Sequence, residues 1–172
     1  SVVSQYSSSY FDITVNLRLD CNICFVIGDS GEGKSFLWQV FSDDSSIMDY
    51  VLTYNYKDIN KELSKRVMEA KNKLIVIDNA DILLDVDLRR YIAFDTDNQY
   101  ILFGRNPECL FLVKENFKEI RFRNKEIIFE IEHKKLFLQD IKRNRLRKVL
   151  AQNCANICAI LSDMPAITTI TR

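Results

Sequence analysis

The feature that most constrains this chain is an eight-residue stretch, residues 28–35, with the sequence GDSGEGKS. It fits the phosphate-loop (P-loop) pattern G-x-x-x-x-G-K-[ST] without a mismatch. Three of the four glycines of the chain fall within it, and glycine permits the tight turn and the close backbone approach that a phosphate group needs. An apolar run over residues 23–27 precedes the stretch, and a helix-like run over residues 35–41 follows it. Because a strand and a helix flank phosphate loops, this context favours a nucleotide site over an ordinary glycine-rich turn.

Each part of the loop has an expected role. Backbone N–H groups and the positive end of the helix dipole face the phosphates. Lys34 reaches the β- and γ-phosphates, and the Ser35 hydroxyl binds Mg²⁺. The expected cofactors are therefore ATP, or another nucleoside triphosphate, and Mg²⁺. The residues predicted to bind the nucleotide are Gly28, Asp29, Ser30, Gly31, Glu32, Gly33, Lys34, Ser35 and Phe36.

A second pattern lies further along the chain, where four apolar residues, 74–77, end in Asp78. This is a Walker B pattern. A carboxylate at the C-terminal end of a parallel strand lies in the crevice where such sheets bind ligands. Asp78 is therefore expected to meet the Mg²⁺ held by Ser35, directly or through water. Asn79 follows it directly, and Asp81 is the nearest further acid.

Another short apolar run, residues 100–103, leads into Gly104 and Arg105. A polar residue that leaves a core strand beside the phosphate site could sense the γ-phosphate. The alternative is a loop whose arginine is simply solvated. Both interpretations of Arg105 stay open from the sequence.

The remaining secondary structure is predicted from hydrophobic periodicity. Residues 1–9 are rich in serine and predicted to be a mobile lead-in. The predicted strands are residues 11–19 and 50–56, with a hairpin over 120–131; the predicted helices are residues 58–72, 82–94 and 134–148.

Composition describes a globular chain of 172 residues, with 47% hydrophobic and 28% charged residues and a net charge of zero. The charge is unevenly placed, since seven Lys and Arg residues and one Asp occur between Lys134 and Lys148. We expect a P-loop nucleotide-binding domain over residues 10–133 and a basic helical extension over residues 134–172. That extension is either a solvated helix or a contact surface for a nucleic acid or an acidic protein.

Five cysteines, an odd number, and the lack of any signal-like segment predict a reducing, cytoplasmic setting. Cys21 and Cys24 have zinc-like spacing, but in a strand residues three apart point to opposite faces. Zinc is therefore the weaker interpretation of this pair. No apolar run reaches the length of roughly 18–20 residues that a membrane span needs, so no membrane insertion is expected.

The loop and the strand before the Walker B pattern resemble the ATPase branch of P-loop proteins that inserts a strand between these two motifs. AAA-type and transporter-type ATPases belong to that branch. The resemblance implies an α/β fold: a three-layer α/β/α sandwich around a mainly parallel five-stranded core sheet. A strand before the loop and a C-terminal hairpin would be added to it. The implied strand order is 5-1-4-3-2, with residues 50–56 at one edge.

The chain also departs from that branch. A glutamate usually follows the Walker B aspartate as the general base, whereas here the residue is Asn79. There is no Leu-Ser-Gly-Gly signature. The GTPase motifs Asp-x-x-Gly and Asn-Lys-x-Asp are not matched by residues 78–81 and 124–127. The catalytic candidates are thus Lys34, Asp78, Asn79 and Asp81. The sequence predicts an ATPase with slow or partner-dependent hydrolysis; the alternatives are a non-hydrolysing nucleotide-dependent binding module and a small-molecule kinase.

Overall fold

The computed structural model describes residues 1–28, 33–59, 62–131 and 152 of the chain. The chain divides into two units, Ser1–Glu132 and His133–Arg172, and all elements below belong to the first. The strands are β1 (Gln5–Tyr10), β2 (Ile13–Arg18), β3 (Ile23–Val26), β4 (Val51–Tyr54), β5 (Leu74–Ile77), β6 (Gln99–Phe103), β7 (Phe117–Arg123) and β8 (Glu126–Ile131). The helices are α1 (Lys34–Asp43), α2 (Leu63–Glu69), α3 (Ala80–Leu83) and α4 (Val86–Phe94), with 3-10 turns η1 (Ser45–Ile47), η2 (Tyr56–Asp58) and η3 (Lys114–Asn116).

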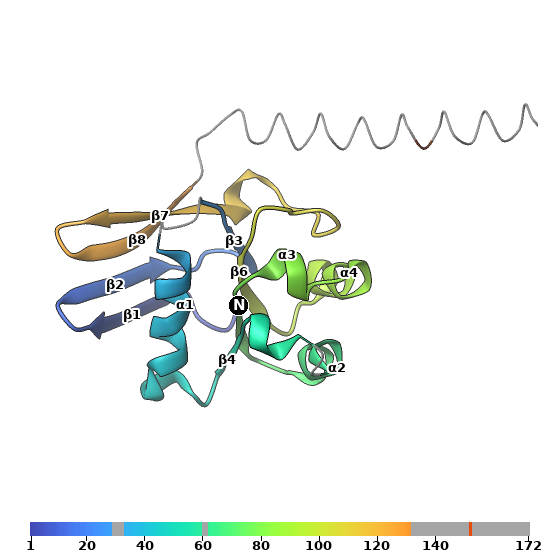
Figure 1. Ribbon diagram of the computed structural model, residues 1–172, viewed down its shortest axis with the longest axis horizontal. Coiled ribbons are helices and arrows are strands. Elements are labelled where there is room, and N and C mark those ends of the chain that lie inside the picture. The colour runs from blue at the N-terminus through green and yellow to red at the C-terminus, as the bar shows by residue number, and fades with distance from the viewer. Residues whose placement is uncertain (29–32, 60–61, 132–151, 153–172) are drawn as a thin grey trace, which may run out of the picture. The chain divides into compact units, whose positions relative to one another are not determined.

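All eight strands join one mixed sheet in the order β1-β2-β8-β7-β3-β6-β5-β4. The pairs β1–β2 and β7–β8 are antiparallel hairpins, whereas β2 pairs with β8, and β3 with both β6 and β7, in parallel. The strands β4, β5 and β6 are also parallel neighbours. Figure 1 shows the two hairpins on the left of the sheet and α2, α3 and α4 on its right.

The predicted fold class is therefore wrong. The described residues do not form a three-layer α/β/α sandwich around a mainly parallel five-stranded core sheet; they form a single eight-stranded mixed sheet with few, short helices of four to ten residues. Hydrophobic periodicity predicts strands one at a time and does not reveal that both hairpins pair into the same sheet. Within that sheet β3, β6, β5 and β4 are consecutive neighbours, and β4 lies at an edge as expected.

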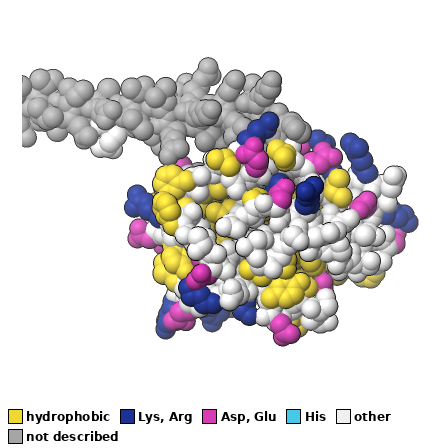
Figure 2. Space-filling model, turned by 180° about the vertical axis from the view of Figure 1, so that it is seen from behind, with side chains coloured by type: hydrophobic (Ala, Val, Ile, Leu, Met, Phe, Trp, Pro, Cys, Tyr) yellow, Lys and Arg dark blue, Asp and Glu magenta, His cyan; other side chains and the backbone are white. Residues whose placement is uncertain are grey.

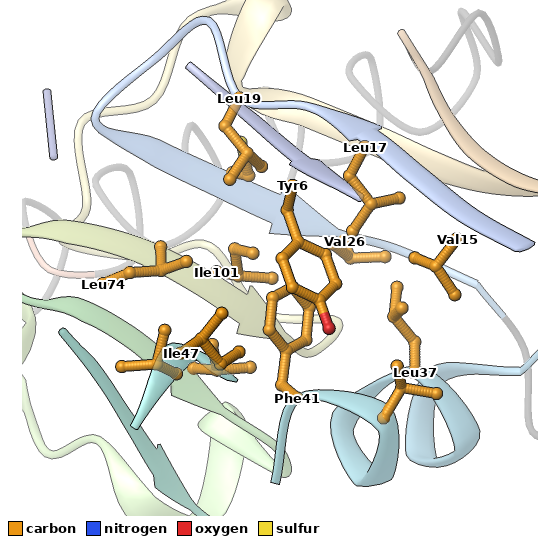
Figure 3. Close-up of a cluster of buried hydrophobic side chains, with 14 of the residues drawn as sticks. Tyr6, Val15, Leu17, Leu19, Val26, Leu37, Phe41, Ile47, Leu74 and Ile101 are labelled. Carbon is orange, nitrogen blue, oxygen red and sulfur yellow. The ribbon is translucent and has the colours of Figure 1, made fainter. Parts of the chain in front are cut away.

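The serine-rich lead-in also differs from its prediction, because most of it is the edge strand β1. Pairing with β2 joins its backbone to the sheet, and one of its side chains, Tyr6, is buried. The Tyr6 ring stacks on Phe41 of α1 at a centroid distance of 4.3 Å, among the buried side chains of the core cluster (Figure 3). The burial of this aromatic ring, worth about 1.5–3 kcal/mol, holds β1 in place.

The helices on either side of the Walker B strand are shorter than their periodicity predicts. The predicted helix 58–72 is reduced to α2, and the predicted helix 82–94 is two helices, α3 and α4. The break comes at Asp85, whose carboxylate caps α4 by accepting a hydrogen bond from the Leu88 N–H. An N-cap aspartate competes with continuation of the preceding helix, so the polar residue within the apolar pattern was the signal for the break.

Candidate functional site

The site begins where β3 leads into the phosphate-loop stretch and α1 follows it. Gly33 occupies the position before α1 with a φ of +88°, a left-handed conformation that favours glycine. Gly33, the N-cap residue, has no side chain with which to cap this end of the helix, and the first N–H groups of a helix have no partner within it. The end of α1 therefore offers backbone donors and a positive dipole end to an anion.

Lys34 and Ser35, the last two residues of the motif, both have partners in the structure. The Lys34 ammonium donates a hydrogen bond to the Gly28 carbonyl, which brings the first and the seventh residues of the motif together. The Ser35 hydroxyl donates a hydrogen bond of 3.2 Å to Asp78 Oδ2. The four residues between, Asp29, Ser30, Gly31 and Glu32, lie outside the described residues.

Asp78 lies at the C-terminal end of β5, and only 9% of its surface is exposed. Its N–H donates to the Tyr54 carbonyl on β4, so the backbone is fixed by the sheet. Its carboxylate accepts from Ser35 through one oxygen and from the Asn79 N–H, at 2.9 Å, through the other. Two residues 43 positions apart thus bring a hydroxyl and a carboxylate together, as the two sequence patterns predict.

These groups line a cleft of about 570 Å³. Its described lining residues are Gly33, Lys34, Ser35, Phe36, Asp78, Asn79, Asp81, Ile82, Phe103, Gly104 and Arg105. Every described residue that the sequence predicts for the nucleotide site is among them except Gly28. Phe36 is half-buried and packs edge-on against Tyr10 at 5.6 Å, while Arg105 is exposed at the cleft. A cleft of this volume is of the size that holds a small ligand.

Asn79 adopts a left-handed conformation, with φ 53° and ψ 43°, immediately before α3. Asparagine enters this region more readily than other non-glycine residues because its short polar side chain bonds locally. The backbone therefore gives a physical reason for asparagine at a position where the P-loop ATPases that the motifs resemble carry glutamate. The predicted catalytic roles of Asn79 and Asp81 stay predictions.

Asp81 has structural partners at the exit of β6. Its carboxylate accepts hydrogen bonds from the N–H groups of Arg105, at 2.8 Å, and Asn106, at 2.9 Å. The Arg89 guanidinium lies 3.8 Å from the same carboxylate. The Asp81 side chain is 34% exposed. Its hydrogen bonds fix the backbone of the loop that carries Arg105. This geometry favours a positioning role for Asp81 over that of a freely placed general base.

Arg89 and Gly104 complete this arrangement, and the sequence analysis assigned a role to neither. The Arg89 side chain is only 5% exposed and donates hydrogen bonds to the carbonyls of Leu84 and Glu108, among others. Gly104 leaves room for the acid: a Cβ at this position would lie 2.8 Å from Asp81 Oδ1. A signal for Arg89 was present, since it falls three residues before Ile92 on the buried stripe of α4.

The donor set at Ser35 and Asp78 fits Mg²⁺. A hydroxyl oxygen and a carboxylate oxygen 3.2 Å apart are hard oxygen ligands, and Mg²⁺ is usually bound by one or two protein groups together with phosphates and water. Among the described residues there is no cluster of three or more His, Cys, Asp or Glu side chains that could hold a metal ion by itself. A magnesium ion here would therefore depend on the nucleotide for further ligands.

The expected partner surface, between Lys134 and Lys148, lies outside the described residues, as do residues 153–172, and its role stays a prediction. On the face shown in Figure 2, Lys and Arg side chains are interspersed with Asp and Glu. Within the part of the chain that the structure describes, no helix is long and apolar enough to cross a membrane. The cytoplasmic location stays a prediction.

Comparison of the chain with protein-family models, with curated proteins and with solved structures finds no match.

Proposed function

We propose that this chain binds a nucleoside triphosphate together with Mg²⁺ in the cleft at the start of α1. One observation carries the proposal: Ser35 Oγ and Asp78 Oδ2 lie 3.2 Å apart, at the N-terminus of a helix whose N-cap residue is Gly33. A phosphate loop and a Walker B acid are expected to converge in this way on a shared metal ion. The resemblance to P-loop ATPases is thus limited to the residues of the site, and the predicted fold class is not needed for it.

Each residue has a role that follows from its chemistry. Lys34 exchanges its bond with the Gly28 carbonyl for contacts with the β- and γ-phosphates, which are stronger because both partners are charged. Ser35 and Asp78 hold Mg²⁺, which neutralises phosphate charge when it is bound. Arg105, exposed at the cleft, contacts the γ-phosphate and so distinguishes a triphosphate from a diphosphate.

Hydrolysis by the chain alone is slow under this proposal. Among the described residues that line the cleft, the acids are Asp78 and Asp81, and each carboxylate already accepts hydrogen bonds from two donor groups. A general base must be free to take a proton from the attacking water, a contribution of about 10²–10⁴ in rate, and an asparagine cannot accept that proton. The same observation supports the second candidate function, a binding module in which the nucleotide orders a surface and no turnover occurs.

The experiment that tests the proposal is a comparison of nucleotide affinity with Mg²⁺ and with EDTA, for the unmodified chain and for Asp78→Asn. Because Asp78 acts through the metal ion, the substitution should weaken binding in Mg²⁺ much more than in EDTA. Asp49→Asn, which removes the same charge from an exposed residue, is the control. An equal loss of affinity in both buffers would contradict the metal role, and release of phosphate measured beside binding separates the ATPase from the binding module.

A further inference from the structure

Two cysteine thiols lie next to each other at the start of β3. Cys24 is in that strand, whereas Cys21 lies in the turn before it. Their Sγ atoms are 3.4 Å apart. The prediction that the two side chains point to opposite faces is therefore wrong. Cys21 precedes the strand, so its side chain does not follow the alternation of side chains along β3.

The two thiols differ in their surroundings. Cys24 is fully buried, and Cys21 is half-buried. Next to them on β7 lies the buried ammonium of Lys118, which makes an ion pair with Asp20 at 2.8 Å. The hydrogen bond from Cys24, assisted by the charge of Lys118, lowers the pKa of Cys21. The hydrogen bond to Cys21 and burial raise the pKa of Cys24.

The difference in surroundings determines the order in which the two thiols react. A thiolate is the nucleophile in disulfide exchange, and a partly exposed cysteine beside a cation has the larger thiolate fraction. Cys21 thus meets an incoming disulfide first. Cys24 is shielded from solvent, so it reacts with its neighbour and not with a molecule in solution.

We propose that Cys21 and Cys24 form a reversible disulfide by exchange with a low-molecular-weight disulfide. The Cys21 thiolate attacks one sulfur of the incoming disulfide, forms a mixed disulfide and releases the first small thiolate. Cys24 then loses its proton and attacks Cys21 Sγ, which breaks the mixed bond and releases the second small thiolate. The two protein thiols are oxidised, and one small disulfide is reduced to two small thiols.

The geometry favours the second step. The two sulfurs have to close from 3.4 Å to a bond length of roughly 2.05 Å, a movement within reach of a turn residue. The other described cysteine, Cys109, lies in the loop after β6, far along the chain from this pair. This inference is independent of the proposed nucleotide site, because it involves none of the residues that line the cleft.

Equilibration of the folded chain with mixtures of reduced and oxidised glutathione, followed by alkylation and tryptic mapping, tests the proposal. Cleavage after Arg18 and Lys34 gives one peptide, residues 19–34, that holds Cys21 and Cys24 and no other cysteine. As the mixture becomes more oxidising, this peptide should lose both alkyl groups and become lighter by two hydrogen atoms. Cys24→Ser should instead trap a glutathione adduct on Cys21, because the second step is blocked.

Two controls separate the proposal from general thiol reactivity. Cys109→Ser should leave the oxidation of the peptide unchanged. The same titration in guanidinium chloride should need a more oxidising mixture, because unfolding removes the contact between the two sulfurs. The proposal is overturned if both thiols remain open to alkylation in every mixture. It is also overturned if the folded and unfolded chains oxidise at the same glutathione ratio, or if the unmodified chain stops at the glutathione adduct.

Discussion

Replacing Asp81 by asparagine tests how the cleft is held together. The Asp81 carboxylate accepts hydrogen bonds of 2.8 and 2.9 Å from the N–H groups of Arg105 and Asn106 and faces the buried Arg89. Hydrogen bonds to a charged group contribute about 1.5–3 kcal/mol each. Because the side chain is 34% exposed, water replaces part of this contribution, and an amide oxygen retains one of the bonds. We expect a loss of about 2 kcal/mol in the free energy of unfolding.

The assay is urea denaturation of the full chain followed by circular dichroism. Asp49→Asn is the matched control, since it removes the same charge from an exposed turn residue, and it should change the unfolding free energy by less than about 0.5 kcal/mol. If Asp81→Asn is as stable as that control, the carboxylate does not hold the loop, and the positioning argument is refuted.

The substitution should also change nucleotide selection if the loop positions Arg105. The ratio of ATP to ADP affinity should fall in Asp81→Asn and in Arg105→Ala. In the double variant it should fall no further than in Arg105→Ala alone, because both changes act through one guanidinium group. Additive losses would mean that Asp81 acts on the nucleotide by another route.

Three further predictions concern single residues. Gly33→Ala should destabilise the chain by about 1–2 kcal/mol in urea denaturation through its φ of +88°, since among the described residues no neighbouring atom lies within 4 Å of the added Cβ; an unchanged midpoint would contradict this. Gly104→Ala should reproduce the fall in the ATP to ADP affinity ratio, because its Cβ displaces Asp81, and an unchanged ratio would refute that contact. The hydrogen bond from Lys118 lowers the pKa of Asp20 in the folded chain. The pair therefore stabilises the fold at any pH above the pKa of aspartate in the unfolded chain, about 3.9. This stabilisation is lost as the pH falls through the pKa of Asp20 in the folded chain. Asp20→Asn should therefore lose about 1 kcal/mol at pH 7 and nothing in strong acid, and a pH-independent difference would contradict it.

Local patterns predicted the elements that carry the site. β3, α1 and β5 follow from continuous apolar runs and from the glycine-rich loop between the first two, and the meeting of Ser35 with Asp78 follows from their positions at strand and helix ends. Each of the three elements is encoded within a stretch of about ten residues. Periodicity and turn chemistry therefore suffice to predict them.

The features that the sequence did not predict depend on contacts between distant segments or on the exact boundaries of the elements. Tyr6 is buried only because β1 pairs with β2 and faces α1. Asp81 meets Arg105 across 24 positions of the chain. The contact between Cys21 and Cys24 depends on where the turn ends and β3 begins. Element boundaries and long-range pairing are the parts of a structure that a single sequence specifies least directly.

Titration calorimetry of Mg-ATP with the unmodified chain and with Lys34→Ala tests most directly whether the phosphate loop binds a nucleotide. Loss of the ammonium removes charge-assisted contacts with the phosphates, so the account predicts a decrease of about 2–4 kcal/mol in the free energy of binding. Lys57→Ala, which removes an exposed lysine outside the cleft, should bind Mg-ATP as the unmodified chain does. Equal affinity of Lys34→Ala and the unmodified chain would contradict the assignment of the nucleotide site.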